Sequence, residues 1–242
     1  MPNYLLRLAF VGTNFSGWQV QPKERTVQGE LTKALETLFK EEVKVIGCCR
    51  TDAGVHALDY VANFKVSKEL EPEKILKALN GMLPKDIGIY EVKRVSDEFN
   101  ARYFVKRKTY LYRIWNSETR NPFLYPFSWQ VKREINLKVL EKALKKLEGI
   151  HDFEGFAKLE EEKNTTINLE RVEISYRENL IEIRLTASHF LRYMVRRIVG
   201  TCVKVALGLY PEEIIEKILK KEVKAPYTAP PQGLHLERVE IL

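Results

Sequence analysis

The feature that most constrains the fold is an order of predicted elements that occurs twice along the chain. Residues 1–104 are predicted to form a strand, a helix, two strands, a helix and a strand. Residues 105–242 repeat this order, with one additional short helix, and each half has a long polar loop after its first strand. Because the same order occurs in both halves, we expect two related domains, residues 1–104 and 105–242.

Hydrophobic periodicity and turn residues set the limits of these elements. In the first half, strands are predicted at residues 4–10, 43–49, 60–66 and 87–94, and helices at residues 27–40 and 72–82. In the second half, strands are predicted at residues 108–115, 169–176, 180–187 and 234–241, and helices at residues 137–148, 189–207 and 211–220. The predicted fold class is α+β, with two related mixed α/β halves whose largely antiparallel sheets join around a basic central cleft.

Composition places the chain among ordinary globular proteins, with 45% hydrophobic and 30% charged residues. No apolar stretch reaches the length of a membrane span, and the first residues lack the sections of a signal peptide. The three cysteines include no Cys-x-x-Cys spacing and the four histidines are scattered, so we expect no metal site. Free buried thiols are typical of a reducing compartment, which favours the cytoplasm. Cys48 and Cys49 are adjacent on a predicted strand and should point to opposite faces.

The charge balance is compatible with a polyanionic partner. Lys and Arg number 40 against 33 Asp and Glu, which gives a net charge of +7. Such a balance suits nucleic acid, although many basic proteins never bind it. The acidic run at residues 160–163 predicts a solvated loop.

The octapeptide at residues 50–57 lies between two predicted strands, where a rigid scaffold can present functional groups. Within it, the carboxylate of Asp52 stands two residues after Arg50 and two residues before Gly54. An Asp-Ala-Gly sequence alone would most simply indicate a turn, because Asp and Gly favour turns for conformational reasons.

The full octapeptide, Arg-Thr-Asp-Ala-Gly-Val-His-Ala, resembles the catalytic loop of the tRNA pseudouridine synthase A family. Further segments similar to that family lie at residues 12–19, 99–102, 107–110, 151–153, 190–196 and 229–236, so the resemblance covers nearly the whole chain. Two positions depart from the family pattern, because His235 stands in place of a tyrosine and Asn168 in place of an arginine.

The resemblance implies an isomerase that breaks the N1–C1′ bond of uridine, turns the base and rejoins it through C5. This reaction involves no net redox change, so no cofactor is expected. Asp52 would be the catalytic carboxylate, either adding to C1′ or removing a proton from the sugar. Arg196 would keep that carboxylate ionised. Tyr110 would stack on the uracil ring and help move the C5 proton, although a half-buried strand tyrosine is the simpler reading of any single Tyr.

The resemblance also implies contacts with RNA. The candidate RNA-binding residues are Trp18, Gln19, Arg50, His56, Arg102, Lys108 and Arg192. Arg50 would assist extrusion of the target nucleotide, and Arg192 would share a helical face with His189 and Arg196. The substrate implied is the anticodon stem-loop of tRNA, at positions 38, 39 and 40, bound by a homodimer.

Several alternatives remain open from the residues themselves. A non-catalytic RNA-binding protein, such as a chaperone, would also be basic and aromatic. A nuclease would gather several carboxylates around metal ions, and Asp59 is the acid closest to Asp52 in sequence. Trp18 could belong to the core, and Asp152 could cap a short helix.

Overall fold

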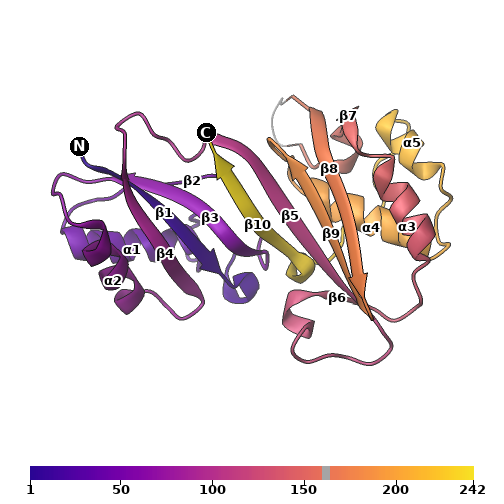
Figure 1. Ribbon diagram of the computed structural model, residues 1–242, viewed down its shortest axis with the longest axis horizontal. Helices are drawn as coiled ribbons and strands as arrows, with labels where there is room; N and C mark the ends of the chain where they lie inside the picture. The colour runs from indigo at the N-terminus through magenta and orange to yellow at the C-terminus, as the bar shows by residue number, and fades with distance from the viewer. Residues whose placement is uncertain (160–163) are drawn as a thin grey trace. The chain divides into compact units, whose positions relative to one another are not determined.

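The computed structural model describes residues 1–159 and 164–242, which form two compact units. Unit 1 contains Met1–Lys106 and His235–Leu242, and unit 2 contains Arg107–Leu234. Each unit is a largely antiparallel sheet with helices packed against it (Figure 1), so the predicted α+β class is confirmed. The acidic run at residues 160–163 lies outside the described residues. In the part of the chain described, no helix has the length and apolar character needed to cross a membrane.

Unit 1 is built on the first set of predicted elements together with the last strand of the chain. These are β1 (Asn3–Phe10), η1 (Gly12–Asn14), α1 (Val27–Phe39), β2 (Val45–Gly47), β3 (His56–Lys65), α2 (Pro72–Met82), β4 (Ile87–Val95) and β10 (Leu234–Ile241). The strands follow the order β4-β1-β3 with antiparallel pairing, and β2 also pairs antiparallel with β3. β10 pairs in parallel with β3, which places His235 opposite His56.

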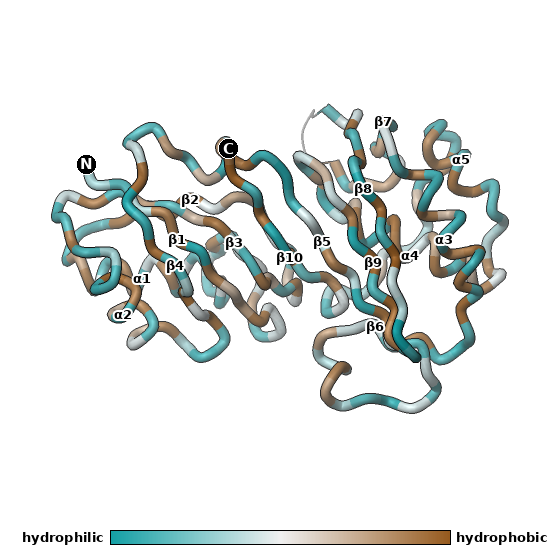
Figure 2. Tube along the Cα trace, viewed as in Figure 1, coloured by the Kyte–Doolittle hydropathy of each residue, from teal (hydrophilic) through white to brown (hydrophobic). Residues whose placement is uncertain are grey.

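Local sequence explains where these elements begin and which face they bury. The Thr26 hydroxyl caps α1 by accepting a hydrogen bond from the Gly29 N–H at 3.2 Å. Pro72 occupies the first turn of α2, where its missing N–H costs nothing. At the start of β4 the residues alternate, with Ile87 and Ile89 buried and Gly88 and Tyr90 exposed, and Figure 2 shows polar and apolar residues interleaved along the strands.

Unit 2 is built on the second set. Its elements are β5 (Val105–Asn116), η2 (Tyr125–Phe127), β6 (Trp129–Val131), α3 (Leu137–Lys145), β7 (Gly149–Asp152), η3 (Glu154–Phe156), β8 (Thr166–Arg177), β9 (Leu180–Ala187), α4 (Met194–Ala206), α5 (Ile214–Leu219) and η4 (Pro231–Gly233). The strand order is β5-β9-β8-β7 with antiparallel pairing, and β6 pairs in parallel with β5. The Asn136 side chain caps α3 by accepting a hydrogen bond from the Val139 N–H at 3.2 Å.

The strand orders of the two units reveal the repeat. The first strand of each set pairs with the third, and the third pairs with the second, giving β1-β3-β2 and β5-β9-β8. β6, β7 and α5 are additions to the second set. By its contacts the final strand belongs to unit 1, whereas the order of elements assigned it to the second half.

The predicted helix at residues 189–207 is wrong at its beginning. The helix starts at Met194, because Tyr193 adopts a left-handed conformation with φ 64° that interrupts the α-helical pattern. His189 and Arg192 therefore precede α4, and they do not share a helical face with Arg196.

The predicted orientation of the adjacent cysteines is also wrong. β2 ends at Gly47, so Cys48 and Cys49 lie in a bend after the strand rather than within it. Their Sγ atoms are 3.8 Å apart, on the same side of the chain. The alternation of side chains in an extended strand does not apply to a bend.

Candidate active site

The octapeptide loop connects β2 to β3 through a tight turn. The Val55 N–H donates a hydrogen bond to the Asp52 carbonyl at 3.1 Å. Gly54 has φ 81°, the left-handed conformation that a type II turn requires at its third position. Asp52 is half-buried, whereas Arg50 is exposed. The turn thus holds the Asp52 backbone in a defined position, as a catalytic carboxylate needs.

The polar loop after β1 supports the octapeptide through main-chain hydrogen bonds. The Trp18 N–H donates to the Thr51 carbonyl at 3.2 Å. The Gly54 N–H donates to the Phe15 carbonyl at 3.4 Å. The segment at residues 12–19, which resembles an RNA-contacting loop, therefore packs directly on the backbone around Asp52.

Two glycines allow this close approach. A Cβ atom at Gly12 would lie 1.9 Å from the Val55 carbonyl oxygen. A Cβ atom at Gly17 would lie 2.6 Å from the Thr51 carbonyl oxygen, and Gly17 also has φ 89°. Both distances are far shorter than any real contact, so only glycine permits the two loops to touch.

Trp18 belongs to the core beneath the octapeptide. Its side chain is 2% exposed and stacks on Tyr60, with ring centroids 4.1 Å apart. The Tyr60 hydroxyl donates to the Cys49 carbonyl at 2.5 Å, just before the octapeptide begins. The Trp18 side chain therefore packs beneath the loop and does not face solvent.

His56, another predicted RNA contact, is also buried, with 2% of its side chain exposed. Its Nδ1 atom accepts a hydrogen bond from the Gly12 N–H at 2.9 Å, so this nitrogen carries no proton. Its ring packs against the ring of His235 at a centroid distance of 4.9 Å. The imidazole thus connects the two loops and does not face solvent.

The remaining predicted RNA contacts differ in exposure. Gln19, Arg50 and Arg102 are exposed on unit 1, and Arg192 is exposed on unit 2. Lys108 is buried, with 7% of its side chain exposed. The exposed four can reach a ligand without any rearrangement of the core.

Two tyrosines of β5 have different environments. Tyr110 is also buried but keeps 7% of its surface exposed; it lies opposite Leu185 of β9 and meets Phe190 edge to face, with ring centroids 4.9 Å apart. Tyr112 is fully buried, and its hydroxyl donates to the Pro230 carbonyl at 2.6 Å. Burial raises the pKa of Tyr112 well above its ordinary value. Tyr112 therefore has a structural role, which leaves Tyr110 as the better candidate for contact with substrate.

Arg196, in the first turn of α4, is oriented by the segment before β10. Its Nε atom donates to the Ala229 carbonyl at 2.8 Å, and the Ala229 N–H donates back to the Arg196 carbonyl at 3.0 Å. The Ala-Pro-Pro-Gln-Gly sequence that begins at Ala229 thus fixes a guanidinium in place.

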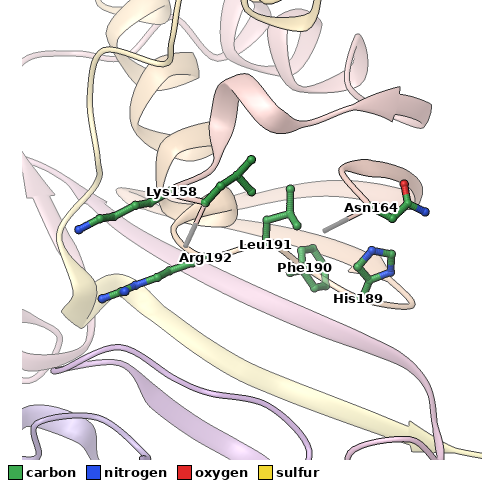
Figure 3. Close-up of a pocket in the computed structure, with 7 residues that line it drawn as sticks. Lys158, Asn164, His189, Phe190, Leu191 and Arg192 are labelled. Carbon is green, nitrogen blue, oxygen red and sulfur yellow. The ribbon is translucent and has the colours of Figure 1, made fainter. Parts of the chain in front are cut away.

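Unit 2 also contains a pocket of about 270 Å³ (Figure 3). It is lined by Lys158, Leu159, Asn164, His189, Phe190, Leu191 and Arg192. The Lys158 N–H donates to the Arg192 carbonyl at 3.0 Å and joins the two segments that form its walls. Sequence reasoning missed Lys158 and Asn164, because no local pattern reveals that two distant segments meet.

Two further acids are engaged in structural contacts. Asp152 accepts a hydrogen bond from the Glu154 N–H at 3.0 Å and pairs with Lys221 at 2.7 Å, whereas the N-cap position of η3 is occupied by Phe153. Asp59 accepts two hydrogen bonds from one Arg7 nitrogen, at 2.9 and 2.8 Å. These contacts favour a structural role for Asp59 over that of a second carboxylate in a nuclease site.

Comparison with known proteins identifies the family. The sequence profile described as tRNA pseudouridine synthase matches residues 8–104 and 143–240, which is more than half of the chain. The tRNA pseudouridine synthase A of Aquifex aeolicus is 71% identical over 239 residues, covering 99% of both chains. The tRNA pseudouridine synthase A of Dictyoglomus turgidum is 43% identical to this chain, and the tRNA pseudouridine synthase A 2 of Bacillus cereus is 40% identical. Each of these alignments covers 99% of this chain and 100% of the relative. The chain therefore belongs to the tRNA pseudouridine synthase A family.

Proposed function

We propose that this protein converts uridine to pseudouridine in the anticodon stem-loop of tRNA, at positions 38, 39 and 40, with Asp52 as the catalytic carboxylate. The observation that carries the proposal is 71% identity with a tRNA pseudouridine synthase A over 99% of both chains. As a member of this family the protein is an isomerase. Its reaction breaks the N1–C1′ bond, forms a C5–C1′ bond, releases the C5 proton and places a proton on N1, so no atom is gained or lost overall.

Asp52 would act at the sugar. Its carboxylate either adds to C1′ as a nucleophile or removes a proton from the sugar as a base, and either role requires the ionised form. The support for Asp52 is its place in a loop braced by η1, Trp18 and the glycine contacts. Bracing of this kind holds a reactive group within the narrow range of geometry that catalysis needs.

Unit 2 would supply two other groups to the same reaction. Arg196 would favour the ionised form of Asp52, and its fixed orientation by Ala229 supports this role. Tyr110 would stack on the uracil and help to move the C5 proton. We propose that residues 1–104 and residues 105–242 both supply catalytic groups to the reaction on tRNA.

The exposed candidates Gln19, Arg50, Arg102 and Arg192 would contact the RNA, and Arg50 would help to extrude the target nucleotide. The buried candidates Trp18, His56 and Lys108 would act by holding those surfaces in place.

We further propose that the protein works as a homodimer in the cytoplasm. Sedimentation of the purified protein with and without tRNA tests the dimer.

The function is tested by incubating the protein with an unmodified tRNA transcript in buffer containing EDTA and analysing the nucleosides after digestion. We expect pseudouridine to appear while uridine falls by the same amount. Transcripts with cytidine in place of uridine 38, 39 or 40 then show which positions react. Binding of tRNA without pseudouridine would indicate an RNA-binding protein instead, and cleavage that EDTA abolishes would indicate a nuclease.

The two β5 tyrosines provide a matched pair of variants. Tyr110→Phe should lower the rate of pseudouridine formation by about 10²-fold, because the proposed proton transfer needs the hydroxyl. Tyr112→Phe removes the same atom from a buried hydrogen bond, so it should cost about 1–2 kcal/mol of stability. Nucleoside analysis measures the rate of pseudouridine formation by both variants, and urea denaturation measures their stability. Equal rates for the two variants would remove Tyr110 from the mechanism.

A further inference from the structure

The loop between β5 and β6, residues 117–128, displays aromatic side chains to solvent. Phe123 is 87% exposed and Tyr125 is 48% exposed. Among the described residues, no other large hydrophobic side chain is as exposed as Phe123. In Figure 1 the loop extends away from the strands of unit 2, and Figure 2 shows apolar residues within it. Covering such rings is favourable, so this β5–β6 loop is a candidate contact surface.

The β5–β6 loop has a defined conformation although its tip is exposed. The Phe123 N–H donates to Asn121 Oδ1 at 3.0 Å, and the Tyr125 N–H donates to the Asn121 carbonyl at 2.8 Å. Near the start of the loop, the Trp115 indole N–H donates to the Thr119 carbonyl at 2.8 Å. These bonds fix the backbone on both sides of Phe123. A partner can therefore bind the ring without having to order a flexible segment.

The charge of this segment suits a polyanion. Residues 119–133 contain three basic side chains, Arg120, Lys132 and Arg133, and no acidic one. All three basic residues are exposed. The Arg120 guanidinium lies over the Tyr125 ring, with Cζ 4.7 Å from the ring centroid. Exposed aromatic rings among basic side chains are typical of surfaces that bind single-stranded nucleic acid.

The size of the surface distinguishes a nucleobase from a second copy of the chain. A stable protein–protein interface buries about 800 Å² on each partner. Phe123 and Tyr125, at about 150–250 Å² each when fully buried, supply far less than that area. A base needs only one face of one ring, because it binds by stacking. The area therefore favours a base over a protein partner.

We infer that the β5–β6 loop binds an unpaired base of the RNA substrate by stacking it on Phe123, with Arg120 bound to a neighbouring phosphate. This inference rests on the proposed function and adds a contact surface to it. Bases in the loops of an RNA are free to leave their neighbours and stack on a protein ring. Every base has a π-face, so the contact adds affinity and little sequence preference.

The first test measures the affinity of Phe123 variants for unmodified tRNA. Phe123→Ala should weaken binding about tenfold, as expected for the loss of one stacked base. Phe123→Leu keeps an apolar side chain without an aromatic face, so it should bind as weakly as Phe123→Ala. Phe123→Trp keeps the face and should bind at least as tightly as the wild type.

Tyr176→Ala is the matched control for these variants. Tyr176 is another exposed aromatic residue of unit 2, in β8, and its removal should leave tRNA affinity unchanged. Wild-type affinity of Phe123→Leu would show that an aromatic face is not required and would overturn the inference. An equal loss in Tyr176→Ala would also overturn it, because the effect would not be specific to the β5–β6 loop.

Salt dependence separates Arg120 from Phe123. Arg120→Gln should lower the slope of log affinity against log KCl by about 0.7, the value for one phosphate contact on a single strand. Phe123→Ala should leave the slope unchanged, because stacking releases no counterions. Lys138→Gln, at an exposed position of α3, is the control for Arg120→Gln and should also leave the slope unchanged. An unchanged slope for Arg120→Gln would reject the phosphate contact.

Sedimentation of Phe123→Ala tests the competing occupant. We expect the variant to sediment like the wild type at every protein concentration. A shift toward a smaller species would assign the β5–β6 loop to an interface between copies of the chain and overturn the inference.

These measurements can fail separately from the proposed function. Pseudouridine formation by the wild type, together with unchanged tRNA affinity of Phe123→Ala, would reject the stacking surface and leave the isomerase standing. Weaker binding by Phe123→Ala, together with no pseudouridine from the wild type, would retain the RNA contact and reject the isomerase.

Discussion

Asp52→Asn is expected to lower the rate of pseudouridine formation by about 10³-fold or more while leaving tRNA affinity within about threefold of the wild type. Asparagine has nearly the same shape as aspartate but can neither add to C1′ nor accept a proton from the sugar. The loop around Asp52 is held by main-chain hydrogen bonds from Trp18 and Val55, which do not involve the carboxylate. The fold and the RNA surface should therefore survive the substitution.

Single-turnover experiments with excess protein measure this rate without interference from product release. Asp59→Asn is the matched control, because the Asp59 carboxylate binds Arg7 and accepts the Val239 N–H at 2.9 Å. We expect this control to lose about 1–3 kcal/mol of stability and to keep its rate per folded molecule. A rate for Asp52→Asn within about tenfold of the wild type would remove the carboxylate from the chemical step.

Gly12→Ala is expected to produce the second large effect. The new methyl group would lie 1.9 Å from the Val55 carbonyl oxygen, so the loop that carries Asp52 must move away. A displacement of about 1 Å in an active site can cost about 10²-fold in rate. We expect that loss together with a destabilisation of about 3 kcal/mol or more, in the range of other overpacking substitutions.

Gly81→Ala is the control for Gly12→Ala. Gly81 lies in α2 and is exposed, and no atom lies within 4 Å of the position that an added methyl group would occupy. Alanine should therefore stabilise the helix by about 0.5–1 kcal/mol. Urea denaturation and pseudouridine formation are measured for both variants. If Gly12→Ala behaves like Gly81→Ala, the close approach of the two loops is not what positions Asp52.

Much of the fold could be predicted because its signals are local. α2 begins and ends at the predicted residues, since Pro72 marks its first turn and the apolar spacing defines its buried face. The start of α4 could not be predicted in this way. It depends on a left-handed tyrosine at position 193, and tyrosine has no intrinsic preference for that conformation.

In the candidate site, too, the features set by local sequence could be predicted, and those set by contacts between distant residues could not. The position of Asp52 in a loop between two strands follows from a contiguous sequence, and the structure places it there. The burial of Trp18 and His56 follows from contacts with Tyr60 and Gly12, which are distant in sequence. The contact of Lys158 with the Tyr193 ring likewise joins segments that are distant in sequence, so no local pattern predicts it.

The central claim is that one carboxylate, Asp52, drives isomerisation without help from a metal ion or cofactor. Its most direct test uses unmodified tRNA labelled with tritium at C5 of uracil, incubated with wild type or Asp52→Asn in EDTA and in the absence of any added cofactor. Release of tritium to water reports loss of the C5 proton, and tRNA binding is measured on the same samples. We predict release by the wild type alone, with both proteins binding the tRNA. Equal release by Asp52→Asn, or none by the wild type, would contradict this account.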